Sequence, residues 1–282
     1  MNIITVNVGQ GSCAIVRNNR EAIIVDCRIP AKDDKAVVFV KEMFAIALKD
    51  HGVKGFILTG FDDDHCCAVG TAIVLQKYRP DWVLYPKYYK DTAEAKDVFG
   101  LIREQESLRK NSPSPLKTIP IRLDQLGNRS LQGLSANFSF ELFSPHIEDM
   151  DCSNNCSIVL KLNGLGNGGF SYLITGDTEV ARWVTIERLF GAALKSHVLA
   201  APHHGSINAV HPASLLRIEP HTILISAGVN NQYGHPSAAA VKVYDRVAKV
   251  VWSTNMNGGG SLLTQPGSAE IVTTFIPSTN AV

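Results

Sequence analysis

The sequence predicts an α/β protein in which strands and helices alternate along the chain. Short apolar runs of strand length, such as residues 53–59 and 197–201, lie between longer segments with helical spacing of apolar residues, such as 33–49. Hydrophobic residues make up 45% and charged residues 19% of the 282 residues, as in an ordinary globular protein. The formal net charge of +1 gives no general preference for nucleic acid or membranes.

No feature of the sequence predicts export or a membrane span. The N-terminus begins with an apolar–polar alternation, instead of a basic region followed by an apolar one. No apolar run approaches the roughly 18 residues that a membrane helix needs, and the six cysteines include no C-x-x-C pair. We therefore expect a cytoplasmic protein that does not bind membranes.

The N-terminal part is predicted to contain strands joined by tight turns and two helices. The expected strands are 1–8, 13–16, 21–25, 53–59 and 82–85, and the expected helices are 33–49 and 68–77. The third strand ends at Asp26. This residue is either a turn former or a carboxylate that orients a metal-bound histidine.

Residues 86–137 form a polar stretch that we expect to be an insertion, with one helix at 93–110. At its start, residues 87–90 (KYYK) interleave basic and aromatic side chains, which suits a surface for single-stranded nucleic acid. A solvated loop with two partly buried tyrosines is the alternative. The chain then returns to the α/β pattern, with strands at 138–143, 157–162, 172–174, 197–201, 222–226, 250–252 and 269–275 and helices at 179–194 and 238–248.

The stretch that organises the chain is 56–70, where an apolar strand is followed by three aspartates and a histidine. Adjacent carboxylates repel one another and are hard to bury. A cation among them removes that cost, and an imidazole beside them adds a further metal ligand. A solvated acidic turn is the alternative explanation for this stretch alone.

Later strands end in residues of the same kind, which favours a metal site. Asp177 follows one strand, His203 and His204 follow the next, and His235 follows a third. Taken singly, these residues are common in turns, loops and helix caps. Because strand ends gather at one edge of a layered α/β protein, we expect them to form one site. The predicted metal ligands are Asp62, Asp64, His65, Asp177, His203, His204 and His235.

The order of these motifs resembles the metallo-β-lactamase superfamily. The motifs are VGQGS at 8–12, TGFDDDH at 59–65, NNCSIVL at 154–160, TGD at 175–177, PHHGS at 202–206 and YGHP at 233–236. The closest resemblance is to the hydrolase domains of competence DNA-uptake channel proteins, and phosphorylcholine esterases of that branch are also similar. It covers nearly the whole chain except 86–137.

The resemblance implies a single domain from 1 to 282 with an αββα four-layer sandwich, in which two mixed β-sheets are flanked by helices. It implies one or two divalent ions, Zn²⁺ or Mn²⁺, with Mg²⁺ as a further candidate. One ion would be held by Asp64, His65, Asp177 and a later histidine. A second would be held by Asp62, a bridging Asp177 and another histidine. Which histidine does which task stays open.

The resemblance further implies a metal-dependent hydrolase of phosphodiester bonds, a nuclease that uses a metal-activated water, with Asp64, His204 and His235 as catalytic residues. The alternatives are a small-molecule phosphoesterase or esterase, and a partly degenerate regulatory module that binds a partner protein. The expected partner is accordingly a nucleic acid, a small phosphoester or a protein. Gly60 stands where the family has its first histidine, which leaves the number of ions open.

Overall fold

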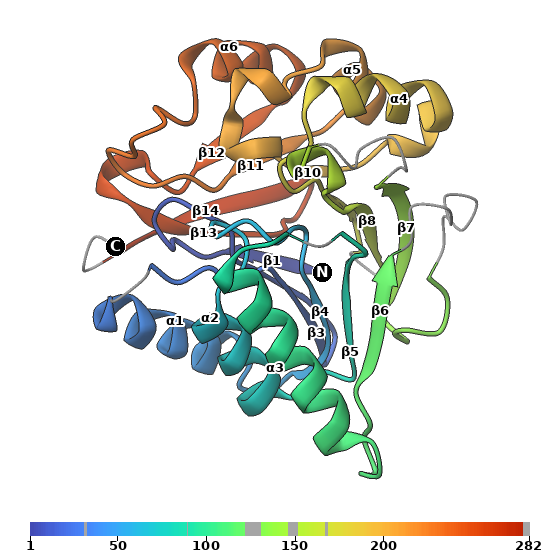
Figure 1. Cartoon of the computed structure of the whole chain (residues 1–282). Helices are drawn as coiled ribbons and strands as arrows, with labels where there is room; N and C mark the ends of the chain where they lie inside the picture. The colour runs from blue at the N-terminus through green and yellow to red at the C-terminus, as the bar shows by residue number, and fades with distance from the viewer. Residues whose placement is uncertain (31–32, 89, 122–130, 146–151, 167–168, 279–282) are drawn as a thin grey trace.

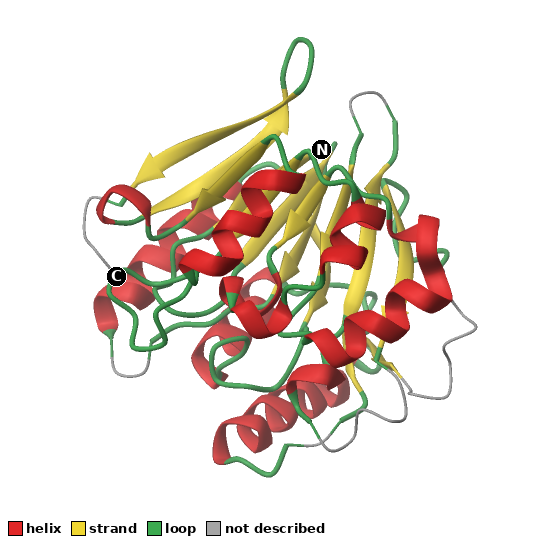
Figure 2. Cartoon of the chain, turned by 90° about the horizontal axis from the view of Figure 1, so that it is seen from above, coloured by secondary structure: helices red, strands yellow, loops and turns green. Residues whose placement is uncertain are grey.

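The computed structural model describes residues 1–30, 33–88, 90–121, 131–145, 152–166 and 169–278. Its elements form four layers, with one group of helices on the outer face of each of two facing β-sheets (Figures 1 and 2). This arrangement confirms the predicted αββα sandwich. No helix in the described part of the chain is both long and apolar enough to cross a membrane.

The first sheet has eight strands among the described residues, in the order β14-β13-β1-β2-β3-β4-β5-β6. Neighbours are antiparallel from β14 to β3 and parallel from β3 to β6. In chain order the strands are β1 (Asn2–Thr5), β2 (Ala14–Asn18), β3 (Glu21–Val25), β4 (Gly52–Ile57), β5 (Trp82–Pro86), β6 (Lys117–Ile121), β13 (Gly260–Pro266) and β14 (Ile271–Pro277).

The second sheet is also mixed and has the described strand order β12-β11-β10-β9-β8-β7. Strands β9 to β12 are parallel, and β7, β8 and β9 are antiparallel neighbours. The strands are β7 (Phe138–Ser144), β8 (Val159–Gly164), β9 (Ser171–Ile174), β10 (Val198–Ala200), β11 (Thr222–Ile225) and β12 (Val250–Ser253).

The helices divide between the two outer faces (Figure 1). The first sheet is covered by α1 (Asp34–Ala47), α2 (Ala68–Ala72) with the π-helix η1 (Ile73–Tyr78), and α3 (Ala93–Arg109). The second sheet is covered by α4 (Val180–Phe190), the 3₁₀-helix η4 (Gly191–Leu194), α5 (Pro212–Ile218) and α6 (Ala238–Val247). Four further 3₁₀-helices are described, namely η3 (Asn154–Cys156), η5 (Pro202–Gly205), η6 (Ile207–Ala209) and η7 (Met256–Gly258).

Alternating side chains of the strands build the layers. In β3, Ile23 joins the apolar cluster between the two sheets, while Ile24 joins the cluster under α1 to α3. In β11, Leu224 points between the sheets and Ile223 packs under α4 to α6. This two-residue period is what a strand buried on both faces requires. The core is therefore continuous through all four layers.

The structure contains elements that the apolar pattern did not predict. Strand β13 and helix α5 were not expected, and β6 lies within 86–137, the segment predicted to be an insertion. Strand β6 contains Pro120, which cannot donate a ladder hydrogen bond and is tolerated mainly on edge strands. It ends the described strand order of the first sheet, so this position suits it.

Two helical glycines give a matched test of the packing. A Cβ at Gly70 in α2 would lie 1.9 Å from the Cys27 carbonyl oxygen, whereas a Cβ at Gly100 in α3 would meet nothing within 4 Å. Gly70→Ala should lower the free energy of unfolding by about 1–3 kcal/mol through overpacking. Gly100→Ala should raise it by about 0.5–1 kcal/mol. Urea denaturation measures both, and changes of the same sign would contradict the contact between α2 and Cys27.

Candidate metal centre

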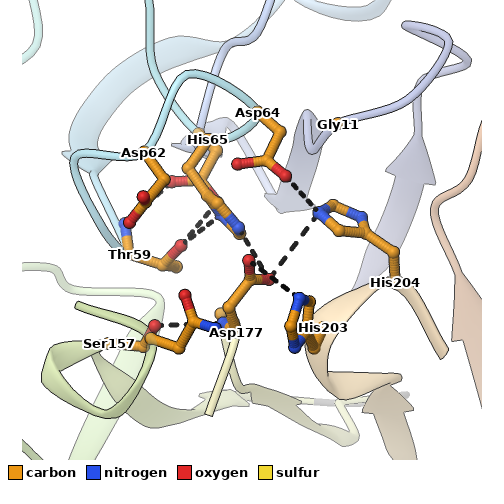
Figure 3. A network of polar contacts seen from close by, with 12 residues as sticks. Gly11, Thr59, Asp62, Asp64, His65, Ser157, Asp177, His203 and His204 are labelled. Carbon is orange, nitrogen blue, oxygen red and sulfur yellow. Dashed lines mark hydrogen bonds and ion pairs between the residues drawn. The ribbon is translucent and has the colours of Figure 1, made fainter. Parts of the chain in front are cut away.

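The candidate centre lies where strands of both sheets end (Figure 3). Asp64 and His65 follow β4 of the first sheet, and Asp177 and His204 follow β9 and β10 of the second. One donor atom from each of these four residues lies within 4.8 Å of the others. Only Asp64 is partly exposed, and the other three are buried. The structure thus brings four of the seven predicted ligands into one cluster.

The orientation of His65 is fixed by a buried hydrogen-bond network. Its Nδ1 atom lies 2.9 Å from Asp26 Oδ2 and 2.8 Å from Thr59 Oγ1. Asp26 also accepts from the Thr59 hydroxyl and backbone N–H, both at 2.7 Å. A carboxylate accepts, so Nδ1 of His65 carries a proton, and Nε2 presents a lone pair when the ring is neutral. Asp26 therefore has the position expected of a carboxylate that orients a ligand.

A hydrogen bond to Nδ1 also fixes the orientation of the His204 ring. Its Nδ1–H donates to the backbone carbonyl of Ser226 at 2.8 Å, so Nε2 of the neutral ring presents a lone pair to the cluster. The turn that carries it is strained, because His203 and His204 both have left-handed backbone angles, with φ of 50° and 53°. Such angles cost a non-glycine residue energy and persist where the surrounding structure enforces them.

The two lone pairs meet carboxylate oxygens that also lack donors. His65 Nε2 lies 2.8 Å from Asp177 Oδ1, and His204 Nε2 lies 3.6 Å from the same oxygen and 3.5 Å from Asp64 Oδ2. Among the described residues, His65 Nε2, His204 Nε2 and Asp177 Oδ1 have no hydrogen-bond partner. Neutral imidazoles aimed at carboxylates repel them unless a cation lies between. The residues therefore fit a divalent ion.

The pKa shifts of the cluster residues also indicate that the cluster favours bound positive charge. Burial lowers the pKa of His65, but the carboxylates of Asp177 and Asp26 outweigh this and raise the pKa well above its usual value. Burial raises the pKa of Asp64, but the nearby imidazoles of His204 and His65 lower it by more than burial raises it. The cluster thus demands positive charge, which either protons on its histidines or one bound cation can supply.

Gly11 and Gly176 allow the acidic loop and the TGD turn to pack closely against neighbouring residues. A Cβ at Gly11 would lie 2.7 Å from the Asp64 carbonyl oxygen, to which the Ser12 N–H donates at 2.7 Å. Gly176 has a φ of 52°, and a Cβ there would lie 2.8 Å from Ser157. Ser157 Oγ in turn accepts from the Asp177 N–H at 3.0 Å. The glycines of two sequence motifs thus allow the loops to approach each other.

The remaining predicted residues surround the cluster. His203 Nε2 lies 3.9 Å from Asp177 Oδ2, and the rings of His203 and His235 are 5.6 Å apart. Asp62 is ion-paired with Lys90. With Asp64, Asp177 and His204, these residues line a cavity of about 610 Å³. The full lining is Gln10, Arg28, Asp62, Asp63, Asp64, Lys90, Thr92, Asn154, Asp177, His203, His204, Asn231, Gln232, Tyr233 and His235.

Some groups at the site were not predicted. Glu179 Oε1 lies 3.5 Å from His203 Nδ1 and accepts from the Asn154 side chain at 3.0 Å. Arg28 lines the cavity while one of its guanidinium nitrogens donates to the Val8 carbonyl at 3.1 Å. Glu179 lies two residues after the TGD motif, so its position in the sequence could have identified it. No feature of the sequence marks Arg28. Tyr89 of the KYYK stretch lies outside the described residues.

Asp26 offers a test of the inferred geometry. Asp26→Asn removes the acceptor that keeps the proton on His65 Nδ1, so the affinity for Mn²⁺ should fall by about 10- to 100-fold. Isothermal titration calorimetry measures this affinity. The matched control is Asp63→Asn, because Asp63 is exposed and outside the cluster. Equal affinities of both variants for Mn²⁺ would contradict the assigned orientation of His65.

Comparison with known proteins supports the fold. No protein-family model matches the chain. The structure of Igni18, a metallo hydrolase from Ignicoccus hospitalis, is similar with a TM-score of 0.54 and 11% identity, over 95% of this chain and 100% of that one. The CmlA β-hydroxylase E377D mutant is similar with a TM-score of 0.51 and 13% identity, over 94% of this chain and 54% of that one.

One curated protein is similar in sequence. ComE operon protein 3 of Bacillus subtilis (strain 168) is 29% identical over 207 residues, which are 72% of this chain. The match spans 23% of the length of ComE operon protein 3, so the chain corresponds to less than a quarter of that protein. Together with the four layers, these similarities show that the chain has the metallo-β-lactamase fold. Asp64, His65, Asp177 and His204 form a candidate metal site within it.

Proposed function

We propose that the chain is a metal-dependent nuclease that hydrolyses phosphodiester bonds. The observation that carries this proposal is the cavity beside the cluster, which is lined by Asp64, Asp177 and His204 together with the cationic side chains of Arg28 and Lys90. A phosphodiester is an anion, and positive groups beside a metal site stabilise the charge of its oxygens. A neutral ester would gain little from them.

Groups around the cavity suit a nucleotide chain better than a small ester. Tyr233 has an exposed fraction of 60%, and its ring stacks on His235 with centroids 5.8 Å apart and planes 27° apart. An exposed aromatic ring beside a site that binds phosphates is a platform on which a nucleobase stacks. The resemblance of the motifs to hydrolase domains of DNA-uptake proteins supports the same substrate.

The proposed roles follow from the contacts. A divalent ion held by Asp64, His65, Asp177 and His204 would lower the pKa of a water and polarise a phosphate oxygen. Ligands of two carboxylates and two imidazoles suit Mn²⁺ or Zn²⁺, with Mg²⁺ less well matched to imidazole. His203 and His235 lie at the cavity outside this cluster, where either ring can donate a proton to a leaving oxygen.

A nuclease assay tests this proposal. The purified chain is incubated with single- and double-stranded DNA in Mn²⁺, Zn²⁺ or Mg²⁺. Asp64→Ala and His204→Ala should lower the cleavage rate by more than about a hundredfold, since even residues behind metal ligands cost about 10- to 100-fold. Asp245→Ala is the control, because Asp245 is exposed and lies outside the cluster and the cavity lining, so this variant should retain most activity.

Two outcomes would redirect the assignment. Hydrolysis of bis-p-nitrophenyl phosphate without cleavage of DNA or RNA would favour a small-molecule phosphoesterase, for which the cavity of about 610 Å³ is large enough. DNA cleavage that survives both substitutions would contradict the assigned site.

Chelation by EDTA should abolish all cleavage that the site supports, and re-addition of Mn²⁺ should restore it.

A further inference from the structure

The cavity contains a lysine in contact with the acidic loop. The ammonium of Lys90 is ion-paired with Asp62 Oδ1, and both side chains are largely buried, with exposed fractions of 29% and 21%. Lys90 precedes α3, and its carbonyl accepts from the Thr92 N–H at 2.9 Å. Thr92 itself caps α3. The backbone of Lys90 is therefore held at the start of a helix, and its side chain reaches across to the loop after β4.

The candidate ligands fall into two groups of different character. Asp64, His65, Asp177 and His204 present unpaired atoms to one point. The second group consists of the other predicted ligands, Asp62, His203 and His235. Asp62 already has the positive partner Lys90, and His203 Nε2 lies 3.9 Å from Asp177 Oδ2. The first group takes its positive charge from outside the chain, either as protons on its histidines or as one bound cation. In the second group, the chain itself supplies positive charge to the carboxylate.

Gly60 removes a further donor from the second group. A Cβ at Gly60 would have only Ser157 Oγ nearby, at 4.0 Å. The same oxygen accepts from the Asp177 N–H, so a side chain at position 60 would begin beside the Asp177 turn. A Cβ therefore fits at position 60, and glycine supplies no donor there. A divalent ion in this group would therefore lack one ligand and would lie beside a like charge on Lys90.

We infer that Lys90 is the built-in second cation of a one-metal centre. Its ammonium neutralises Asp62 where a second ion would otherwise bind, and its remaining N–H groups face the cavity to hold an anionic oxygen of the substrate. An ammonium has three donors, of which the contact with Asp62 uses one. The part of the inference about the substrate rests on the proposed hydrolysis of phosphodiesters, but the metal count does not.

Metal counting tests the first part. The chain is equilibrated with Mn²⁺, and bound ions are measured by elemental analysis, with electron paramagnetic resonance to detect a coupled Mn²⁺ pair. We expect one ion per chain in the wild type. We expect two coupled ions in the double variant Gly60→His/Lys90→Met, which restores a donor and removes the competing charge. Lys87→Met is the control, because Lys87 is exposed and outside the cavity lining, and it should keep one ion.

The outcomes separate this inference from the proposed function. Two coupled ions in the wild type would overturn the role of Lys90 and leave the hydrolase proposal standing. No bound ion in the wild type would overturn both. A double variant that is folded by circular dichroism yet still binds one ion would show that Lys90 does not exclude the second ion, and would overturn the inference.

Phosphate binding tests the second part without relying on turnover. Inorganic phosphate is titrated into the Mn²⁺-loaded chain in a calorimeter. Lys90→Met should weaken binding by about tenfold or more, as expected for the loss of a charged hydrogen bond. Lys90→Arg keeps a charged donor and should retain most of the affinity. Unchanged phosphate affinity in Lys90→Met would contradict a contact between Lys90 and the anion.

Discussion

The buried carboxylate of Asp177 is the group on which the candidate site depends. Burying a charge is costly unless it is paired, and the two imidazoles nearest to Asp177 cannot pair with it while they are neutral. Their N–H groups are already used by Asp26 and by the Ser226 carbonyl. The missing positive charge is what makes this point in the fold a candidate metal site.

The same cluster joins the two halves of the sandwich. Asp64 and His65 come from the first sheet, whereas Asp177 and His204 come from the second (Figure 3). A cation bound by all four would link the sheets at one edge, in addition to the apolar core between them. Because such an ion binds only the folded chain, the site couples metal affinity to the stability of the fold.

Much of this could be predicted from the sequence, because strand ends in a layered α/β protein meet at one edge. That rule gives seven candidate ligands, of which the structure brings Asp64, His65, Asp177 and His204 into one cluster. It does not reveal contacts across the insertion, because the pairing of Lys90 with Asp62 depends on where α3 begins in space. Strand β13 was missed, since its apolar core is short, and β6 was masked by its proline and its polar flanks.

The fold alone does not determine which reaction the chain catalyses. The similar structures include both a metallo hydrolase and a β-hydroxylase, so the ligands and the cavity must decide the reaction. Here the deciding features are a cluster that needs one cation, a glycine where a further donor would start, and a lysine that pairs with the spare carboxylate. Each of these three features favours one bound ion over two.

The most direct test of the central claim is the anomalous scattering of Mn²⁺ in a crystal of the chain. The account predicts one strong anomalous peak in contact with His65 Nε2, His204 Nε2 and the carboxylates of Asp64 and Asp177. A map without a peak at this point, or with its main peak elsewhere, would contradict the claim that these four residues form the metal centre.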